Sequence, residues 1–431
     1  MHAGADAVEH GDSTENGMPI ERMMLFLPVI GLAVAAALQP ILRDQPLPIR
    51  LFSPYQSFPH FTAIAVLTLL ATVRRFEIVP VLLLGTVLEA MHVALLLAQG
   101  RNVMDSWTTF GLAFWYASVA VGLWHVARSS RARRWHEVDR VLLRVAFPLA
   151  FTHALYGLWL TVQVIPATFD NVLYAFDGLL GPPVATFLAG LCRHNQAWSI
   201  VAMIVYHGLW LMMTLVLFAQ CRTDQRQALG LMSRYILLGF VGWMLYFAVP
   251  GSETAGAFWN AYGDQLPLPS EVSLGRFVVD SGQPRNAMPS LHMSWALLLA
   301  METRRMGRPW SYIGTTFAFA TALATLGVGG HYLIDLVVAV PFTVSVYAGS
   351  FLFHRRQWLT ERVLAAVGGA AMTALLLATI RFGTGALRET PWTARVLVVG
   401  VLSLSLALHF LAERRGSAAV ALRFAPANGL C

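Results

Sequence analysis

Long, nearly uncharged apolar runs are the feature that most limits what this chain can fold into. Many of them reach 18 residues or more, which is enough to cross about 30 Å of hydrocarbon as an α-helix. Only 12% of the 431 residues are charged and 57% are hydrophobic, whereas soluble domains contain about 25% charged residues. A membrane β-barrel would instead show short segments of alternating hydrophobicity. The sequence therefore predicts an all-α fold, a polytopic transmembrane helical bundle.

The apolar runs divide the chain into about twelve predicted spans, and neither an internal repeat nor a long linker separates them. A secondary transporter would commonly show such a repeat and a polar site at mid-membrane depth. A non-enzymatic transporter is therefore kept only as an alternative. The predicted spans are 23–42, 56–73, 78–99, 107–127, 143–165, 197–220, 233–250, 288–303, 310–328, 331–353, 360–380 and 393–412.

Arginine counts in the loops give the predicted orientation. The loop 128–140 holds five arginines, so we expect it in the cytoplasm, where basic residues are enriched. Alternation then places the tails 1–22 and 413–431 inside, while the arginine-containing loop 381–392 is the main exception. The expected location is a bacterial-type plasma (inner) membrane.

The basic residues are all arginines, because the chain contains no lysine and has a net charge of +7. The excess is what cytoplasmic loops of membrane proteins usually carry, and the arginines are scattered, so we expect no nucleic-acid partner. A phosphate group bound by this chain would have to be held by arginine, histidine or backbone N–H groups.

The first candidate motif is Arg-Asn-Ala-Met-Pro-Ser-Leu-His at 285–292. Pro289 suits the first turn of a helix, whose unpaired N–H groups form a ready anion site. Ser290 adds a hydroxyl there, and His292 lies in the same turn. Arg285, a few residues earlier, is able to contact a phosphate in bidentate fashion. We predict Ser290 and Arg285 as substrate-phosphate ligands.

The second candidate motif is Gly-Val-Gly-Gly-His-Tyr-Leu-Ile-Asp at 327–335. The glycines allow a tight turn between two spans, after which His331 begins the next helix. Asp335 follows four residues later, on the same helical face. Its carboxylate is expected to accept the proton-bearing nitrogen of His331 and leave the other nitrogen as a nucleophile.

Topology places His292 and His331 at the same membrane boundary, on the extracytoplasmic face, because each begins an inward-going span. A single histidine at a span end is more often an ordinary interfacial residue. Two at one depth, one of them backed by a carboxylate, predict phosphoryl transfer. His331 attacks phosphorus to form a phosphohistidine, and His292 acts as general acid and then base.

The outer segment 166–196 contains Phe-Asp-Asn-Val-Leu-Tyr-Ala-Phe-Asp-Gly-Leu-Leu-Gly and predicts an amphipathic or re-entrant helix at the interface. Its two acidic residues, Asp170 and Asp177, are expected at the surface of that helix, and binding of lipid headgroups is the alternative role for them.

Met288-Pro289-Ser290-Leu291-His292 and Gly330-His331-Tyr332-Leu333-Ile334-Asp335 resemble the type 2 phosphatidic acid phosphatase superfamily. They are most similar to its inositolphosphotransferase branch, which includes inositol phosphorylceramide synthase. The resemblance implies that His331 is the nucleophile, His292 the acid and base, and Asp335 the orienting carboxylate. It also implies a metal-independent reaction that needs no cofactor. The chain departs from the superfamily pattern in two ways: it has no lysine, and Thr325 stands where an arginine is usual.

The resemblance covers a phosphatase-like six-helix core, expected at 143–353. It leaves accessory N-terminal helices at 23–142 and two additional C-terminal helices at 354–412. The expected function is a membrane lipid phosphotransferase that moves a phosphate-bearing, phosphoinositol-like headgroup between lipid substrates. The alternative is a lipid phosphate phosphatase with the same histidine pair. Lipids and the bilayer are the expected partners, and the oligomeric state stays open.

Overall fold

The computed structural model is almost entirely helical, which confirms the all-α prediction. The predicted N-terminal tail lies outside the described residues up to residue 19, and the predicted C-terminal tail does so from residue 424. The structure describes residues 20–38, 58–100, 112–182, 184–252, 257–258, 267–278, 284–352 and 359–423.

Short helices and strands lie between the long helices. The first half of the chain forms α1 (Ile20–Met24), α2 (Leu27–Leu38), α3 (Phe58–Thr72), η1 (Arg75–Glu77), α4 (Ile78–Ala98), α5 (Leu112–Arg128), α6 (Arg131–Val164), β1 (Ala167–Thr168), α7 (Asp170–Leu180), α8 (Val184–His194) and α9 (Gln196–Thr223). The second half forms α10 (Gln225–Leu245), β2 (Phe277–Val278), α12 (Leu291–Arg304), α13 (Arg308–Gly327), α14 (Leu333–Leu352), α15 (Leu359–Ala378), η5 (Thr379–Gly383), α16 (Thr384–Leu387) and α17 (Pro391–Arg423).

Six helices in the described part of the chain are long and apolar enough to cross a membrane. They lie at Arg75–Ala98, Gln196–Thr223, Gln225–Leu245, Leu333–Phe351, Thr360–Leu387 and Pro391–Glu413. These helices support an integral membrane protein. All twelve predicted spans overlap helices, but α12 has only 14 residues, which makes it about 21 Å long. The twelve spans and the six-helix core therefore stay predictions.

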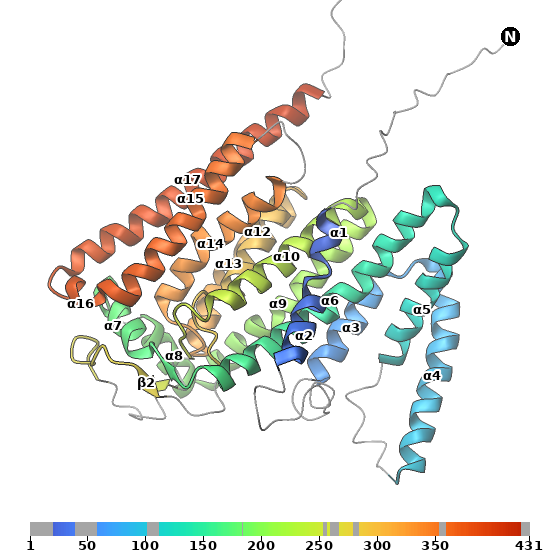
Figure 1. Ribbon diagram of the computed structural model, residues 1–431, viewed down its shortest axis with the longest axis horizontal. Helices are drawn as coiled ribbons and strands as arrows, with labels where there is room; N and C mark the ends of the chain where they lie inside the picture. Colours follow the sequence, from blue (N-terminus) through green and yellow to red (C-terminus); the bar gives the residue numbers. More distant parts are fainter. Residues whose placement is uncertain are drawn as a thin grey trace, which may run out of the picture.

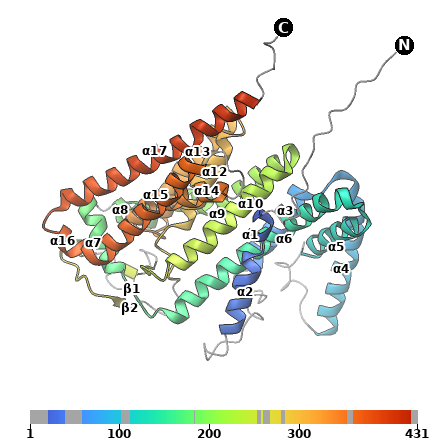
Figure 2. The ribbon, with the colours of Figure 1, turned by 45° about the horizontal axis from the view of Figure 1, so that its top comes forward.

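The long helices from α9 onward run roughly parallel to one another, as Figure 1 shows. α7, α16 and β2 gather at one end of this bundle, and α4 lies at the edge of the molecule farthest from α17 (Figures 1 and 2). One cluster of buried apolar side chains extends from Leu25 to Leu408. Packing is thus continuous across the predicted boundaries at 142 and 353, which stay predictions.

The segment predicted at the interface folds into α7 and α8, which meet at an angle of 104°. This bend fits either a broken span or a re-entrant loop. The expectation that Asp170 and Asp177 lie at the surface is wrong, since they are only 0% and 3% exposed. α7 is buried on nearly all sides because it packs against α14, α16 and α17. Helical periodicity identified an apolar face, but it does not reveal how many neighbours cover the polar one.

A buried ion pair joins the accessory helices to the start of the predicted core. The Arg144 guanidinium in α6 lies 2.5 Å from the Glu77 carboxylate in η1, and both side chains are fully buried. Arg74 contacts the same carboxylate at 2.7 Å, and Arg144 also donates to the Ser118 carbonyl of α5. Glu77 and its arginine partners therefore connect the segment after α3 with α5 and α6.

Replacing Glu77 with alanine is expected to lower the free energy of unfolding by about 3–5 kcal/mol, because Arg144 is left buried without its counter-charge. Thermal unfolding of the detergent-purified protein measures the change. Glu389→Ala, at an exposed position near α17, is the control. Equal unfolding temperatures for the two variants would contradict the structural importance of this pair.

Candidate active site

His331 lies in the short connection between α13 and α14, two residues before α14 begins. Gly329 adopts a positive φ of 72°, a conformation that side-chain-bearing residues rarely adopt, and lets the chain reverse there. The imidazole is only 1% exposed. The sequence expectation that His331 itself begins the helix is thus off by two residues.

The Nδ1 atom of His331 has two acceptors beside it. The Ala287 carbonyl oxygen lies at 3.0 Å and Oδ2 of Asp335 at 3.4 Å. A carbonyl can only accept a hydrogen bond, so Nδ1 carries the proton and Nε2 keeps its lone pair. The expected tautomer follows, although the nearer acceptor is a backbone carbonyl 44 residues away in the sequence.

Asp335 lies in the first turn of α14 and is fully buried. Its Oδ2 atom also accepts the backbone N–H of Tyr332 at 2.7 Å. The carboxylate therefore holds both the ring of His331 and the backbone that follows it. Among the described residues, its Oδ1 atom has no hydrogen-bond partner.

His292 is the second residue of α12, and its ring lies beside that of His331. The two ring centroids are 6.1 Å apart, with an angle of 62° between the planes. His292 also stacks on Tyr206 of α9, with ring centroids 3.9 Å apart and an angle of 22° between the planes. The structure thus brings together the two histidines predicted from sequence, and the ring of Tyr206 orients one of them.

Ser290 is the N-cap of α12 and is completely buried. Its side-chain oxygen accepts from the Met293 N–H at 3.3 Å, and its own N–H donates to the Asp335 carbonyl at 3.3 Å. Pro289 therefore precedes the cap and does not occupy the first helical turn, contrary to expectation. These contacts give Ser290 a structural role in joining α12 to α14, and phosphate binding by its hydroxyl stays a prediction.

Arg285 is also buried, with 1% of its surface exposed. Its backbone N–H donates to Thr161 Oγ1 at 3.2 Å, and its Nε donates to the Ile165 carbonyl at 3.0 Å. Burial lowers the pKa of the guanidinium, while the nearby Asp170 carboxylate raises it. Arg285 therefore binds the C-terminal end of α6, and a phosphate-binding role stays a prediction.

Thr325 stands at the position where the resembled superfamily usually carries an arginine. It lies on a buried face of α13. It is fully buried, and its hydroxyl donates to the Thr321 carbonyl at 2.9 Å. This contact satisfies the hydroxyl within its own helix.

Sequence reasoning missed three residues around the histidine pair: Tyr206, Asp170 and Asp177. Tyr206 lies in an apolar helix, where a tyrosine carries no specific signal. The spacing of Asp170 and Asp177 was a usable signal, because residues seven apart share one face of a helix. Carboxylates on a face that becomes buried require hydrogen-bond partners. Their contacts converge on the turn that holds His331, through Tyr332, Leu333 and Ile334.

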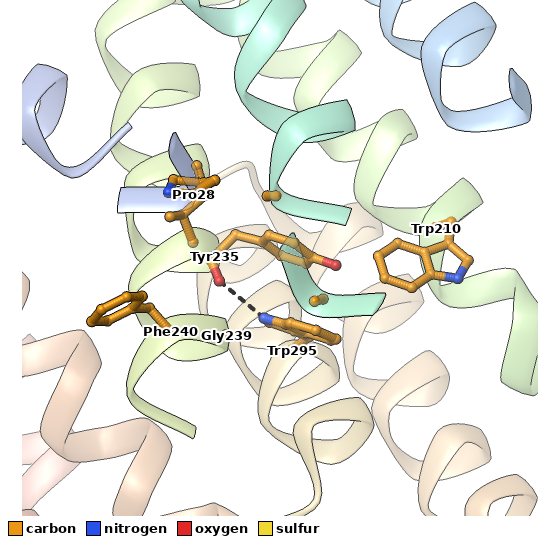
Figure 3. A pocket seen from close by; sticks show the side chains of 9 residues that line it. Pro28, Trp210, Tyr235, Gly239, Phe240 and Trp295 are labelled. Carbon is orange, nitrogen blue, oxygen red and sulfur yellow. Dashed lines mark hydrogen bonds between the residues drawn. The ribbon is translucent and has the colours of Figure 1, made fainter. Parts of the chain in front are cut away.

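An aromatic layer lies one helical turn from His292 toward the middle of the bundle. Figure 3 shows Trp210, Tyr235 and Trp295 around a small hollow, with Trp295 donating to the Tyr235 carbonyl at 3.0 Å. Tyr235 and Trp295 stack with ring centroids 4.7 Å apart. The hollow measures about 20 Å³ and holds no more than about one water molecule. The aromatic layer packs against α12 through Trp295, and the hollow is too small to hold a lipid chain.

Within the described residues, no group of three or more histidine, cysteine, aspartate or glutamate side chains is arranged to hold a metal ion. The expected metal independence of the reaction stays a prediction.

Comparison with known proteins found one family. Residues 171–349 match the family model of the PAP2 superfamily, a range that contains His292, His331 and Asp335. Members of this superfamily are generally phosphatases or phosphotransferases. The match supports the superfamily and an enzyme of this general kind, and it does not distinguish the inositolphosphotransferase branch. No curated protein and no solved structure matches the chain.

Proposed function

We propose that this protein is a membrane lipid phosphotransferase that works through a phosphohistidine at His331. The observation that carries the proposal is the pairing of two imidazoles with ring centroids 6.1 Å apart. Attack requires reacting atoms about 3–3.5 Å apart, and hydrogen bonds between oxygen and nitrogen span about 2.9–3.0 Å. One phosphate group can therefore contact both rings at once.

In the first step, Nε2 of His331 attacks phosphorus of the donor lipid, and a P–N bond forms. The P–O bond to the lipid alcohol breaks, and protonated His292 gives its proton to the departing oxygen. The positive charge that develops on His331 is stabilised by the Ala287 carbonyl and the Asp335 carboxylate beside Nδ1. The alcohol leaves as a neutral lipid.

In the second step, neutral His292 takes the proton from the hydroxyl of the acceptor. The acceptor oxygen attacks phosphorus, the P–N bond breaks and His331 regains its lone pair. His292 ends protonated, ready for the next donor. Stacking on Tyr206 keeps its ring in one orientation through both steps. Phosphoinositol is the headgroup that the family resemblance favours.

The phosphate oxygens need stabilisation as they gain charge. The N–H groups of Leu291 and His292 at the start of α12 are the proposed donors, since the positive end of a helix dipole attracts anions. Arg285 is the proposed cationic ligand, because it belongs to the segment that leads into α12. Its approach to the phosphate would require release of the Ile165 carbonyl.

The membrane setting supports lipid substrates. The chain has helices long and apolar enough to span a bilayer, and the matched superfamily acts on lipid phosphate esters. The proposed site faces the outside of the cell, where ATP is not at hand. A reaction that exchanges one phosphoester for another fits that location.

The rival function is a lipid phosphate phosphatase, which the superfamily match favours equally. It differs only in the second step, where water replaces the acceptor alcohol. Phosphatidylinositol and phosphatidic acid, each radiolabelled at phosphorus and mixed with ceramide, separate the two. We expect the label of phosphatidylinositol in a new lipid. Free inorganic phosphate from phosphatidic acid, with no labelled lipid product in either reaction, would establish the phosphatase instead.

A further inference from the structure

Two buried carboxylates of α7 bind the segment that follows His331. Both oxygens of Asp177 accept backbone N–H groups at the start of α14, from Leu333 at 2.7 Å and Ile334 at 2.9 Å. Two turns earlier on the same helix, Oδ1 of Asp170 accepts the Tyr332 hydroxyl at 2.8 Å. Three consecutive residues after His331 are thus held by α7.

The contacts of Asp177 replace a local helix cap. The first N–H groups of any helix lack partners within it, and a side chain just before the helix usually supplies them. Here His331 and Tyr332 occupy those positions, and the acceptor comes from α7, more than 150 residues earlier in the chain. The two acceptor oxygens also lie at the positive end of α14, where partial negative charge is favourable.

Asp170 connects the same turn to the loop that follows α10. Its carboxylate accepts from the Ser252 N–H at 2.9 Å and from the Ser252 hydroxyl at 3.0 Å, besides a contact from Thr168. The neighbouring Gly251 carbonyl accepts the N–H of Ala287, whose own carbonyl binds His331. Asp170 therefore holds two of the segments that surround the imidazole.

This loop could not approach α7 so closely with a larger residue. A Cβ atom at Gly251 would lie 2.5 Å from Leu173 of α7 and 3.0 Å from the Cβ of Ala287. The glycine allows three segments to meet around one carboxylate. A charged group in such a dry place costs free energy unless hydrogen bonds compensate it, and Asp170 and Asp177 are both compensated by them.

We infer that Asp170 and Asp177 are positioning residues for the nucleophile: α7 fixes the His331–Tyr332 turn and thereby the direction of Nε2. This inference rests on the proposed role of His331. The turn is not part of a helix, so its position depends on contacts at both of its ends. A displacement of about 1 Å at a reacting atom lowers the rate by about 100-fold. Loosening α7 should therefore slow the chemical step more than it weakens substrate binding.

The mildest test removes one hydroxyl group. Tyr332→Phe deletes the hydrogen bond to Asp170 and keeps the buried ring. Tyr174→Phe is a matched control, because the Tyr174 hydroxyl on α7 donates to the Pro267 carbonyl, away from the His331 turn. With labelled phosphatidylinositol, we expect kcat of Tyr332→Phe to fall about 10-fold, an intermediate loss on the scale of misplaced reacting groups. KM should stay within about twofold, and Tyr174→Phe should match wild type.

A stronger test replaces Asp177. Asp177→Ala removes both acceptors and should lower kcat about 100-fold, whereas Asp177→Asn keeps one acceptor oxygen and should fall between it and wild type. The fraction of correctly folded molecules is measured separately, as the monodisperse fraction in size-exclusion chromatography that also unfolds at the wild-type temperature, and kcat is divided by that fraction. A merely structural role would reduce that fraction and leave the corrected kcat unchanged.

The outcomes separate this inference from the proposed function. If wild-type protein forms no phosphohistidine, or if His331→Ala remains active, the proposed function fails. If His331 behaves as proposed but Tyr332→Phe equals Tyr174→Phe, or the corrected kcat of Asp177→Ala equals that of wild type, the positioning role of α7 is overturned. A graded loss in kcat from wild type through Asp177→Asn to Asp177→Ala, at constant KM, supports it.

Discussion

Replacement of His331 by alanine is expected to abolish turnover while the protein remains folded. Removing a covalent nucleophile lowers kcat by a factor on the order of 10⁴ or more, equivalent to at least about 5 kcal/mol of transition-state stabilisation. No other described imidazole shares its position between Ala287 and Asp335. Turnover and phosphohistidine labelling with radiolabelled phosphatidylinositol and phosphatidic acid measure both losses.

The side chain of His331 is buried, so its removal leaves the Ala287 carbonyl without the imidazole donor. His331→Gln serves as a second variant, since its amide can still donate there. His194→Gln, at an exposed position near the end of α8, is the matched control for a histidine replacement. Thermal unfolding near wild type together with absent turnover is the expected result. Turnover near wild type in either His331 variant would remove the assigned mechanism.

Replacement of His292 is expected to have the second-largest effect, and the effect should depend on the leaving group. A general acid and base contributes about 10²–10⁴-fold, so His292→Ala should lose this much with a lipid alcohol as leaving group. A phosphate ester of para-nitrophenol needs no proton donor, because nitrophenolate leaves readily as an anion. His331 should therefore still be phosphorylated in this variant.

The second step still needs a base, so phosphohistidine should accumulate in His292→Ala. A burst of nitrophenolate equal to one per active site, followed by slow release, is the expected time course. Tyr206→Ala, which removes the ring that stacks on His292, is a useful comparison because it disturbs orientation without removing the imidazole. Equal losses for both leaving groups in His292→Ala, with no labelled protein, would contradict its role as acid and base.

The sequence was most informative where the signal was local. Apolar runs identified where helices lie, because the cost of unpaired backbone groups in lipid leaves a spanning segment few alternatives to a helix. Spacing placed Asp335 one turn from His331, and the contact at 3.4 Å exists. The pairing of His292 with His331 followed from alternating topology, which brings every second loop to the same membrane face. Loop arginines alone left the active-site face a prediction.

Span counting was less certain, because length and hydropathy do not describe a helix enclosed by its neighbours. α12 is both short and largely buried, so it carries the site without the length of a full span. By length and composition, six helices of the described residues qualify as spans, and the predicted twelve stay a prediction.

By itself, the sequence determined a helical membrane protein and two histidine motifs, since backbone hydrogen bonding and residue spacing act over a few residues at a time. Only the tertiary structure decided what surrounds those motifs. The Ala287 carbonyl accepts a hydrogen bond from Nδ1 of His331, Tyr206 stacks on His292, and Asp177 caps α14. Each of these contacts joins residues more than 40 positions apart. Periodicity shows which face of a helix is apolar, but the partner of that face depends on how all the helices pack.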